Sequence, residues 1–469
     1  MIFQQFEAKG LSHFSYAVGS KEEAEIAIID PERDIKTYIT FAAENRVKIS
    51  YILETHIHAD YASGARALAE RTGAKLFVSA YDTNQKYAYN FPHNDIKEGE
   101  KIEIGKTVIE ALHTPGHTPE HISFLVYDKE RSADQPVSML SGDFLFVGSV
   151  GRPDLLGDGD KLPLAKQLYN SIQTKLKNLP DSLEIYPGHG AGSLCGAGMS
   201  DAQHTTLGLE REANPYLQQL TEQEFTDKIL GSIPHFPEYY LRMKQLNSDG
   251  APLLESLAKT PALTPEEFAK AIGEKCIVLD VRNPLAFGGG HIDGAINIPS
   301  TDQMSFYGPV VLSYYLPIYL VVEDVSKVRD YVQALVRVGI ENIQGYLQPN
   351  FNSWVNRGND FTDLPQASVF ALQDFMDIGE AISVIDVRSA SEWKSGHIKG
   401  AKHIYLGDLI NSSKSLPKDK EEPVFCLCGG GFRSSIASSV LMKMGYENVY
   451  NVFGGMTAWK GAGLPLTDK

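Results

Sequence analysis

Short apolar runs alternate with amphipathic segments along the first 255 residues. The apolar runs predict β-strands at residues 24–30, 51–53, 75–79, 107–112, 122–127, 137–140 and 183–186. Between them, residues 34–45, 62–72 and 162–177 carry apolar positions at helical spacing. Mixed strands with amphipathic helices between them predict a layered α/β sandwich with its helices on the outside.

The second half of the chain repeats itself with an offset of 106 positions, the distance from Asp280 to Asp386. Three motifs share this offset: residues 278–282 recur at 384–388, 290–295 at 396–401, and 339–342 at 445–448. One constant offset indicates two copies of a single globular unit with few insertions. Each copy alternates strand and helix, which predicts a parallel sheet covered on both faces.

Length and composition are those of a multidomain globular protein. The chain has 469 residues, of which 43% are hydrophobic and 22% charged. No apolar run approaches the roughly 20 residues of a membrane helix. The first residues lack the basic and apolar regions of a secretory signal, so we expect a cytoplasmic protein.

Charge and cysteine content narrow the function classes. A net charge of −16 argues against binding to nucleic acid or to an anionic membrane. Four cysteines, Cys195, Cys276, Cys426 and Cys428, are too few for a disulfide scaffold of this size. A functional cysteine in this chain should therefore act as a thiolate.

Metal-ligand side chains follow the predicted strands of the first half. His56, His58 and Asp60 lie within five positions after the strand at residues 51–53. Single polar residues follow three further strands: His117, Asp143 and His189. Imidazole and carboxylate groups together are typical ligands of transition metals, and α/β folds place their chemistry at strand ends. The pattern predicts a metal centre.

These motifs resemble the metallo-β-lactamase superfamily. The resemblance covers most of residues 10–190 and rests on His56-x-His58-x-Asp60, Gly116-His117-Thr118, Gly142-Asp143 and Gly188-His189. Hydrolases of this superfamily usually carry a histidine of the second metal site where this chain has Tyr61. A neutral phenol is a poor replacement, so the resemblance implies a single metal and favours a function other than hydrolysis.

Within the superfamily, the first domain resembles the persulfide dioxygenases, which hold one Fe(II). The resemblance implies one Fe(II) per chain, with His56, His117 and Asp143 as its ligands. Two histidines and one carboxylate leave open positions for O₂ and a substrate sulfur. The groups expected to orient these ligands or to bind substrate are His58, Asp60, Tyr61, His189 and Arg152. Arg152 is alternatively the partner of Asp154 in a structural ion pair. We expect Cys195 and His121 to be structural.

The repeated units resemble rhodanese domains. The signature is an Asp-Val-Arg strand end followed by a Gly-His-Ile-x-Gly-Ala turn, whose aspartate, arginine and histidine should pair to brace the loops. In the second copy, residues 428–433 match the family's Cys-x-x-Gly-x-Arg loop. The resemblance implies that Cys428 is the nucleophile and that Arg433 adds a charge-assisted contact.

The composition of this loop explains why a thiolate would be stable there. Gly429, Gly430 and Gly431, followed by Phe432, let backbone N–H groups converge on the sulfur, and a helix predicted from Ser434 adds its positive end. Both effects stabilise a thiolate or persulfide anion. Cys426 lies two residues earlier. It is either a buried strand residue or a redox partner of Cys428.

The first copy lacks this chemistry. Val322 occupies the position that corresponds to Cys428, and Glu323 and Asp324 follow it where the second copy has glycines. An apolar side chain cannot carry sulfur, and the two acids would repel an anionic substrate. We expect this copy to be inactive and to serve as a scaffold, spacer or dimer surface.

Together, these features predict three domains: a persulfide dioxygenase at residues 1–255, an inactive rhodanese at 256–362 and an active rhodanese at 363–469. The whole chain resembles persulfide dioxygenase–sulfurtransferase fusions. The expected reactants are a low-molecular-weight thiol persulfide and O₂, and the expected products are sulfite and thiosulfate. The direction of the rhodanese step stays open, and we expect a homo-oligomer.

Two other functions remain as alternatives. One is a zinc thioester hydrolase of the glyoxalase II kind, fused to a sulfurtransferase that serves a separate step. The other is a sulfur-responsive binding module without catalysis.

Overall fold

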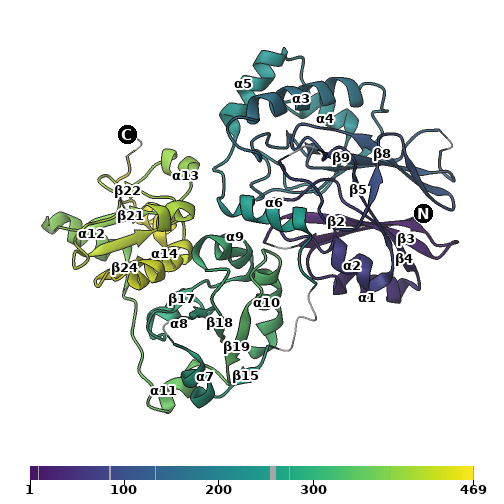
Figure 1. Cartoon of the computed structure of the whole chain (residues 1–469). Coiled ribbons are helices and arrows are strands. Elements are labelled where there is room, and N and C mark those ends of the chain that lie inside the picture. Colours follow the sequence, from purple (N-terminus) through teal and green to yellow (C-terminus); the bar gives the residue numbers. More distant parts are fainter. Residues whose placement is uncertain are drawn as a thin grey trace. The chain divides into compact units, whose positions relative to one another are not determined.

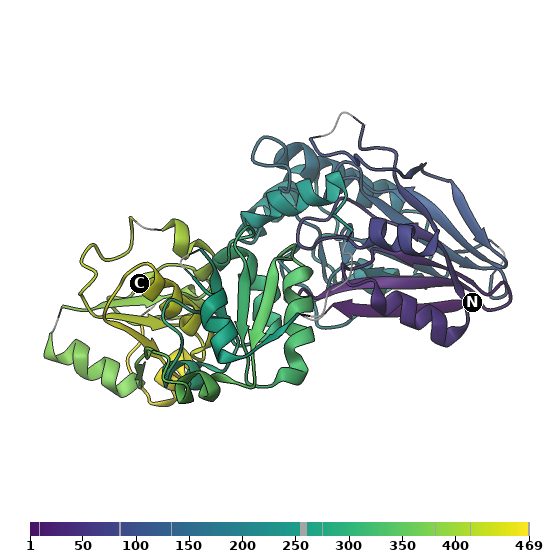
Figure 2. The ribbon, with the colours of Figure 1, turned by 60° about the horizontal axis from the view of Figure 1, so that its bottom comes forward.

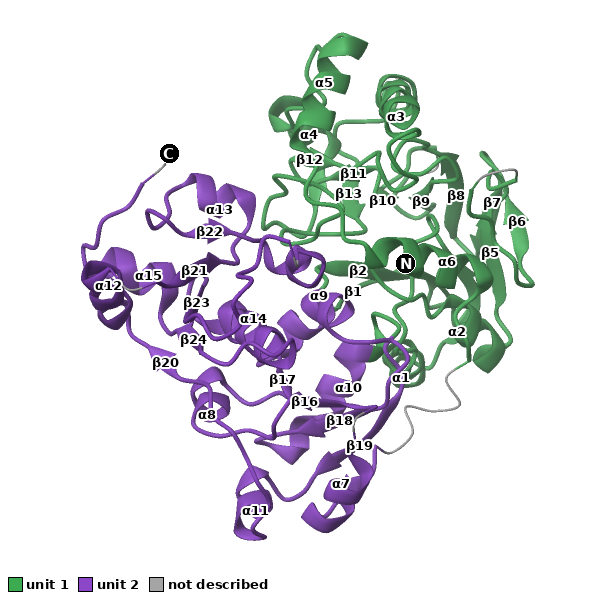
Figure 3. Ribbon diagram, turned by 60° about the vertical axis from the view of Figure 1, so that its left-hand side comes forward, with its two compact units in different colours: residues 1–255, 336–339 green, residues 256–335, 340–469 purple. Residues whose placement is uncertain are grey.

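The computed structural model describes residues 1–8, 10–83, 86–132, 134–253, 260–273, 275–379, 381–412 and 414–467. The chain forms two compact units (Figure 3). Unit 1 comprises Met1–Glu255 and Val336–Gly339, and unit 2 comprises Ser256–Leu335 and Ile340–Lys469. The finer division of unit 2 into residues 256–362 and 363–469 stays a prediction. No helix among the described residues is long and apolar enough to cross a membrane.

Unit 1 contains two six-stranded sheets (Figure 1). The first sheet has the order β1 (Ile2–Ala8), β2 (His13–Ser20), β3 (Glu25–Ile29), β4 (Lys48–Leu53), β5 (Lys75–Ser79), β6 (Asn94–Ile96). The second has the order β14 (Thr205–Thr206), β13 (Glu184–Pro187), β10 (Ser138–Gly142), β9 (Ile122–Asp128), β8 (Thr107–His113), β7 (Lys101–Ile104). A short hairpin joins β11 (Leu145–Phe146) to β12 (Ser149–Val150).

Three apolar clusters explain why these sheets stack with helices outside. One joins the facing sides of the two sheets, with Val18 and Ile29 from the first and Ile109 and Phe124 from the second. A second packs the outer face of the first sheet on α1 (Lys36–Asn45) and α2 (Ala65–Thr72). A third packs the second sheet on α3 (Lys161–Lys175) and α5 (Glu222–Ser232). The predicted layered sandwich, with helices outside two sheets, is confirmed.

Two more helices complete unit 1. α4 (Leu207–Ala213) begins at Thr206, whose hydroxyl accepts a hydrogen bond from the backbone N–H of Leu209. α6 (Tyr239–Asp249) buries Lys244, Asn247 and Ser248 beside its apolar residues. Buried polar side chains need partners. Those of Lys244 and Asn247 lie in the loop that follows β4, and Ser248 donates to the carbonyl of Ala88.

Unit 2 contains two five-stranded parallel sheets with the same topology. The first has the order β15 (Ala262–Leu263), β19 (Ile343–Leu347), β18 (Ile318–Val321), β16 (Ile277–Asp280), β17 (Ile296–Asn297). The second has the order β20 (Gln366–Ala367), β24 (Val449–Val452), β23 (Val424–Leu427), β21 (Ser383–Asp386), β22 (Lys402–His403). The identical strand order confirms the duplication inferred from the repeated motifs.

Helices cover both faces of each parallel sheet (Figure 2). In the first copy they are α7 (Pro265–Ala271), α8 (Pro284–Gly288), α9 (Thr301–Val311), α10 (Val328–Val336) and α11 (Phe351–Asn356), with the 3₁₀ turn η1 (Val325–Lys327). In the second they are α12 (Val369–Ile378), α13 (Ala390–Lys394), α14 (Phe432–Lys443) and α15 (Gly455–Gly461), with η2 (Leu406–Asn411).

A buried ion pair braces each copy where the repeated Asp-Val-Arg motif predicts one. The Arg388 guanidinium donates to both oxygens of Asp386 and, at 3.0 Å, to the carbonyl of Gly396. Arg282 and Asp280 repeat these contacts in the first copy. The expected histidine partner is wrong: His397 Nδ1 pairs with the backbone carbonyl of Trp393 instead. The brace therefore consists of one arginine, one aspartate and a loop carbonyl.

Removing one partner of this brace should destabilise the second rhodanese copy. Asp386→Ala leaves the guanidinium of Arg388, which is 3% exposed, buried without its counter-charge. We expect a loss of about 3–5 kcal/mol in the free energy of unfolding, measured by urea denaturation. Asp374→Ala, at an exposed position of α12, is the matched control and should change stability by less than about 0.5 kcal/mol. Equal effects of the two substitutions would contradict the brace.

Candidate metal centre and thiol site

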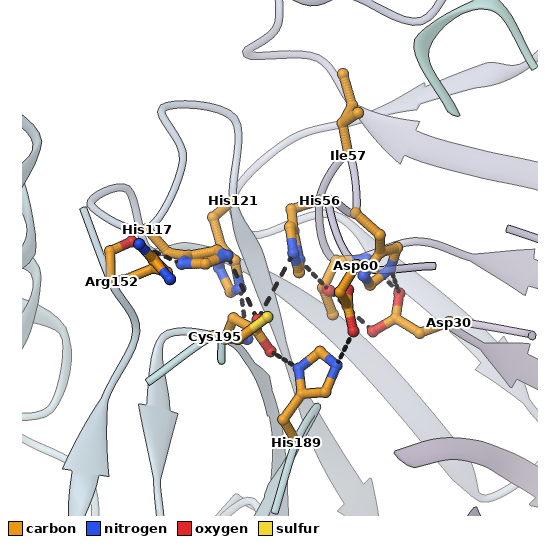
Figure 4. Close-up of polar contacts among 12 residues, drawn as sticks. Asp30, His56, Ile57, Asp60, His117, His121, Arg152, His189 and Cys195 are labelled. Carbon is orange, nitrogen blue, oxygen red and sulfur yellow. Dashed lines mark hydrogen bonds and ion pairs between the residues drawn. The ribbon is translucent and has the colours of Figure 1, made fainter. Parts of the chain in front are cut away.

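Four loops of unit 1 converge at the carboxyl ends of β4, β8, β10 and β13. They carry His56, His117, Asp143 and His189, each 1% exposed or less. Figure 4 shows the rings of His56 and His117 directed toward one region, with His189 and Asp60 beside it. Because the strands end on the same side of the stacked sheets, residues up to 133 positions apart meet there.

Three of these groups could hold one metal ion. Ligand atoms of His56, His117 and Asp143 all lie within 4.8 Å of one another. Asp143 Oδ2 lies 3.4 Å from His117 Nε2 and 3.9 Å from His56 Nε2. Among the described residues, neither Asp143 Oδ2 nor His117 Nε2 has a hydrogen-bond partner, although both are buried. Buried polar atoms without partners are costly, and a cation bound between them would satisfy both. The residues present therefore fit a metal ion.

The opposite edges of the two rings are fixed by hydrogen bonds. His117 Nδ1 pairs with the carbonyl of Arg152 at 2.8 Å, which orients Nε2 toward Asp143. His56 Nδ1 pairs with the hydroxyl of Thr55 at 2.9 Å. Burial lowers the pKa of both His56 and His117 well below the ordinary value. Both imidazoles are therefore neutral near pH 7, which is the form that binds a metal.

His189 is held between two carboxylates. Its Nδ1 lies 2.7 Å from Asp143 Oδ1, and its Nε2 lies 2.8 Å from Asp60 Oδ2 (Figure 4). Burial alone would lower the pKa of His189, but Asp143 and Asp60 outweigh it and hold that pKa well above its ordinary value. His189 thereby links the candidate ligand Asp143 to Asp60.

Tyr61 does not restore a second metal site. Its hydroxyl donates to the backbone carbonyl of Asp30 at 3.3 Å, and burial raises its pKa well above the ordinary value.

Asp60, His189 and Cys195 also bring ligand atoms within 4.8 Å of one another. However, burial raises the pKa of the Cys195 thiol to about 11, so it stays protonated near pH 7. His58 Nε2 lies 3.2 Å from Asp30 Oδ1. Its role in orienting the ligands or binding substrate stays a prediction.

Four further residues support the loop after β4 and were missed in the sequence. Asp30 accepts from the backbone N–H and the hydroxyl of Thr55 at 2.7 and 2.8 Å. Glu120 Oε1 accepts from the N–H of Ile57 at 3.1 Å, and Lys244 Nζ donates to the Ile57 carbonyl at 2.8 Å. Asn247 donates to the carbonyls of His58 and Tyr61. Asp30 ends a strand and could have been noticed, but nothing in the sequence links α6 to this loop.

Arg152 belongs to the structure rather than to substrate binding. Its Nε and one Nη donate to the two oxygens of Asp154 at 2.6 and 2.8 Å. The Nη that contacts Asp154 also donates to the carbonyl of Pro234, and the other Nη donates to the carbonyl of Leu194. All three guanidinium nitrogens are therefore engaged by the chain, and the side chain is buried. The prediction of an anion clamp at Arg152 is wrong, and the alternative, a structural ion pair, describes its contacts.

The candidate thiol site of unit 2 lies at the junction of β23 and α14. The backbone N–H of Gly431 donates to Cys428 Sγ at 3.1 Å, and the Ser434 hydroxyl donates at 3.4 Å. Gly431 adopts a left-handed conformation, with φ of 101°, at the start of α14. The N–H of Gly431 and the N-terminus of α14 place partial positive charge beside the sulfur.

Arg433, predicted to contact the sulfur substrate, forms an ion pair with Glu392, and its role toward the substrate stays a prediction. Its two Nη atoms each lie 2.7 Å from one oxygen of Glu392. Hydrogen bonds from Arg433 lower the pKa of Glu392 to about 2, so this pair stays charged at neutral pH. Arg433 therefore fixes the end of the loop, and Phe432 beside it is exposed.

Neither Cys426 nor the first rhodanese copy offers a second reactive thiol beside Cys428. Cys426 lies inside β23, and burial raises its pKa to about 12, so it is a poor redox partner for Cys428. In the first copy, Val322 is fully buried at the end of β18, followed by exposed Glu323 and Asp324. That loop offers no nucleophile.

Family models match both halves of the chain. The model described as Metallo-beta-lactamase superfamily matches residues 10–189. The model described as Rhodanese-like domain matches residues 264–356 and 370–462. Together the matches cover both sites described above.

Individual proteins match in the same way. Hydroxyacylglutathione hydrolase GloC of Haemophilus influenzae is 30% identical over 213 residues, which are 42% of this chain and 89% of the relative. The mitochondrial persulfide dioxygenase ETHE1 of Mus musculus is 28% identical over 229 residues, 48% of this chain and 78% of the relative. Among solved structures, a metallo-beta-lactamase from Staphylococcus aureus matches this chain with a TM-score of 0.67 and 37% sequence identity. The match covers 74% of this chain and 98% of that one.

Removing one imidazole should empty the candidate metal centre. His117→Ala deletes the Nε2 that faces Asp143, so we expect metal affinity to fall by at least about tenfold. The measurement is metal content per chain after anaerobic purification. His204→Ala, at an exposed histidine of the same unit, should retain the metal content of the unaltered protein. Full metal content in His117→Ala would place the metal elsewhere.

Proposed function

Because the chain belongs to the metallo-beta-lactamase superfamily and carries two rhodanese-like domains, we propose that it is a bifunctional enzyme of sulfide oxidation. The first domain would be a persulfide dioxygenase with one Fe(II). The second rhodanese copy would be a sulfurtransferase that uses Cys428. The observation that carries the proposal is the pairing of a single three-ligand centre with a sulfur-binding thiol on one chain.

The metal centre supports a dioxygenase because its three candidate ligands lie together and both ring nitrogens of His189 are engaged by carboxylates. His56, His117 and Asp143 form a two-histidine, one-carboxylate face, which leaves positions open for two further ligands. His189 is bonded to Asp143 and Asp60 rather than available to a second ion. A single centre with open positions suits a substrate sulfur beside O₂.

The overall reaction of the first domain balances as R–S–SH + O₂ + H₂O giving R–SH, sulfite and two protons. Bound Fe(II) would supply O₂ activation and a site for the substrate sulfur. The residues of the chain would hold the centre in position and exclude bulk water, since each ligand is buried. His189 keeps Asp143 fixed through Oδ1, so that Oδ2 remains directed at the metal.

The second domain would handle the sulfane sulfur. The Cys428 thiolate attacks the outer sulfur of a persulfide, forming a new S–S bond while R–S⁻ leaves with the electron pair of the old bond. Sulfite then attacks the outer sulfur of the Cys428 persulfide, which yields thiosulfate and regenerates the thiolate. The N–H of Gly431 and the hydroxyl of Ser434 stabilise the sulfur anion. The reverse direction uses the same atoms.

A thioester hydrolase is the second candidate, favoured by the 30% identity to hydroxyacylglutathione hydrolase GloC. That function would require two zinc ions and an activated water between them. The contacts of Tyr61 and His189 weigh against a second ion. We expect hydrolysis of S-lactoylglutathione by the zinc-loaded chain to be no faster than that by its His117→Ala variant. Cleavage that requires His117 and is accompanied by two zincs per chain would establish the hydrolase instead.

Two substitutions should separate the proposed activities. His117→Ala should abolish persulfide-dependent O₂ uptake and leave thiosulfate–cyanide sulfur exchange unchanged, because Cys428 lies in the other unit. Cys428→Ser should do the converse and leave sulfite as the main product, since serine forms no persulfide. Oxygen uptake and product identification measure both effects.

Cys276→Ser is the matched control for Cys428→Ser, because Cys276 contacts only the backbone of Gly273 within hydrogen-bonding distance among the described residues. It should behave as the unaltered chain in both assays. Normal rates of thiosulfate formation by Cys428→Ser would refute the coupling of the two domains. If the chain were a binding module without catalysis, no persulfide would form on it and Cys428→Ser would change no rate.

A further inference from the structure

The metal loop, which comprises residues 55–63 after β4, is held by a helix outside the stretch that matches the metallo-beta-lactamase model. That match ends at residue 189, whereas α6 begins at Tyr239. Lys244 and Asn247 of this helix are buried, with 1% and 2% of their surface exposed. Because they lie three positions apart, both project from one face of α6.

Asn247 closes the second half of the metal loop. Its Nδ2 donates to the carbonyl of His58 at 2.9 Å and to that of Tyr61 at 2.7 Å. Its Oδ1 accepts from the backbone N–H of Ser63 at 2.8 Å. Residues 57–62 form neither helix nor strand, so their backbone groups depend on partners of this kind. One buried amide thereby fixes three backbone groups of the loop.

Lys244 and Glu120 hold the first half of the loop at Ile57, which Figure 4 labels beside His56. Lys244 Nζ donates to the Ile57 carbonyl at 2.8 Å, and Glu120 Oε1 accepts from the Ile57 N–H at 3.1 Å. That N–H belongs to the peptide bond that joins Ile57 to His56. Fixing this peptide plane restricts where the His56 ring can lie, in addition to the bond between His56 Nδ1 and the hydroxyl of Thr55.

We propose that Lys244 and Asn247 are positioning residues of the metal centre: they fix the metal loop so that His56 Nε2 faces Asp143 before a metal binds. The inference rests on the candidate metal centre and not on the reaction proposed for it. His56 Nε2 lies 3.9 Å from Asp143 Oδ2, and rotation of the loop backbone would move the ring away from that oxygen. Ligands held in place in advance bind a metal more tightly than ligands that must be ordered during binding.

The two side chains act by donating to backbone carbonyls, so substitutions of similar shape can remove the bonds. Asn247→Asp keeps the acceptor for the N–H of Ser63 and replaces the amide donor with an oxygen that faces two carbonyl oxygens. Lys244→Met keeps most of the length of the side chain and removes the ammonium that donates to Ile57.

The test is a titration of the full chain with Co(II), whose visible absorption reports the geometry of its ligands. We expect Asn247→Asp and Lys244→Met each to weaken Co(II) binding by about tenfold or more and to shift the absorption of the bound ion. Each titration is made well below the midpoint of thermal unfolding, so that folded variant is compared with folded unaltered chain. A merely structural role would lower that midpoint and leave the affinity and the absorption unchanged.

Gln245 provides matched controls on the exposed face of the same helix, where its amide contacts Asp249. Gln245→Glu repeats the change from amide to acid, and Gln245→Met places methionine at the neighbouring position. Both should keep the Co(II) affinity within about twofold of that of the unaltered chain. If Asn247→Asp does not fold, Lys244→Met decides the inference alone.

Affinity and absorption equal to those of the unaltered chain, in either folded variant, would overturn the inference whatever the thermal stability of that variant. Co(II) binding that persists undiminished in His117→Ala would remove the candidate metal centre and the inference with it. Weaker binding and shifted absorption in both variants support the inference even if the iron-loaded chain takes up no O₂. In that case the proposed dioxygenase fails while the inference stands.

Discussion

One buried interaction determines much of the metal centre: the imidazolium of His189 hydrogen-bonded to Asp60 and Asp143. It engages both ring nitrogens of His189 and leaves Asp143 Oδ2 facing His56 and His117. Asp143 Oδ2 and His117 Nε2 are buried and have no hydrogen-bond partner among the described residues, and one cation between them would satisfy both. Two negative charges and one positive charge away from water are stable only as such a network, so these positions should be intolerant of substitution.

The residues predicted from the sequence are those that local pattern identifies. His56, His117 and Asp143 each follow an apolar strand, and strand ends in one α/β layer meet at one edge. Cys428 stands in a glycine-rich loop before a helix. By contrast, Lys244 and Asn247 reach the metal loop from 187 to 189 positions away, on a helix that no motif in the sequence links to it. Pattern also finds charged side chains without always finding their partners, as with Glu392, the partner of Arg433.

The two rhodanese copies share the features that stabilise the fold but differ in those that the proposed reaction requires. Both retain the same strand order and the same buried aspartate–arginine brace, which stabilise the sheet and its loops. Only the second retains the cysteine and the glycines that direct backbone donors at sulfur. The first lacks the nucleophile and presents Asn297 to Ser435 and Ser439 of α14 in the second copy.

The most direct test of the central claim, oxidation of a persulfide at one three-ligand centre, is a stoichiometry. Chain purified without oxygen and of known iron content is given a low-molecular-weight persulfide, and O₂ consumed is compared with sulfite plus thiosulfate formed. The account predicts one iron per chain and one O₂ for each oxidised sulfur atom, counted as sulfite or as the sulfonate of thiosulfate. Two metals per chain, or no O₂ uptake by the iron-loaded protein, would contradict it.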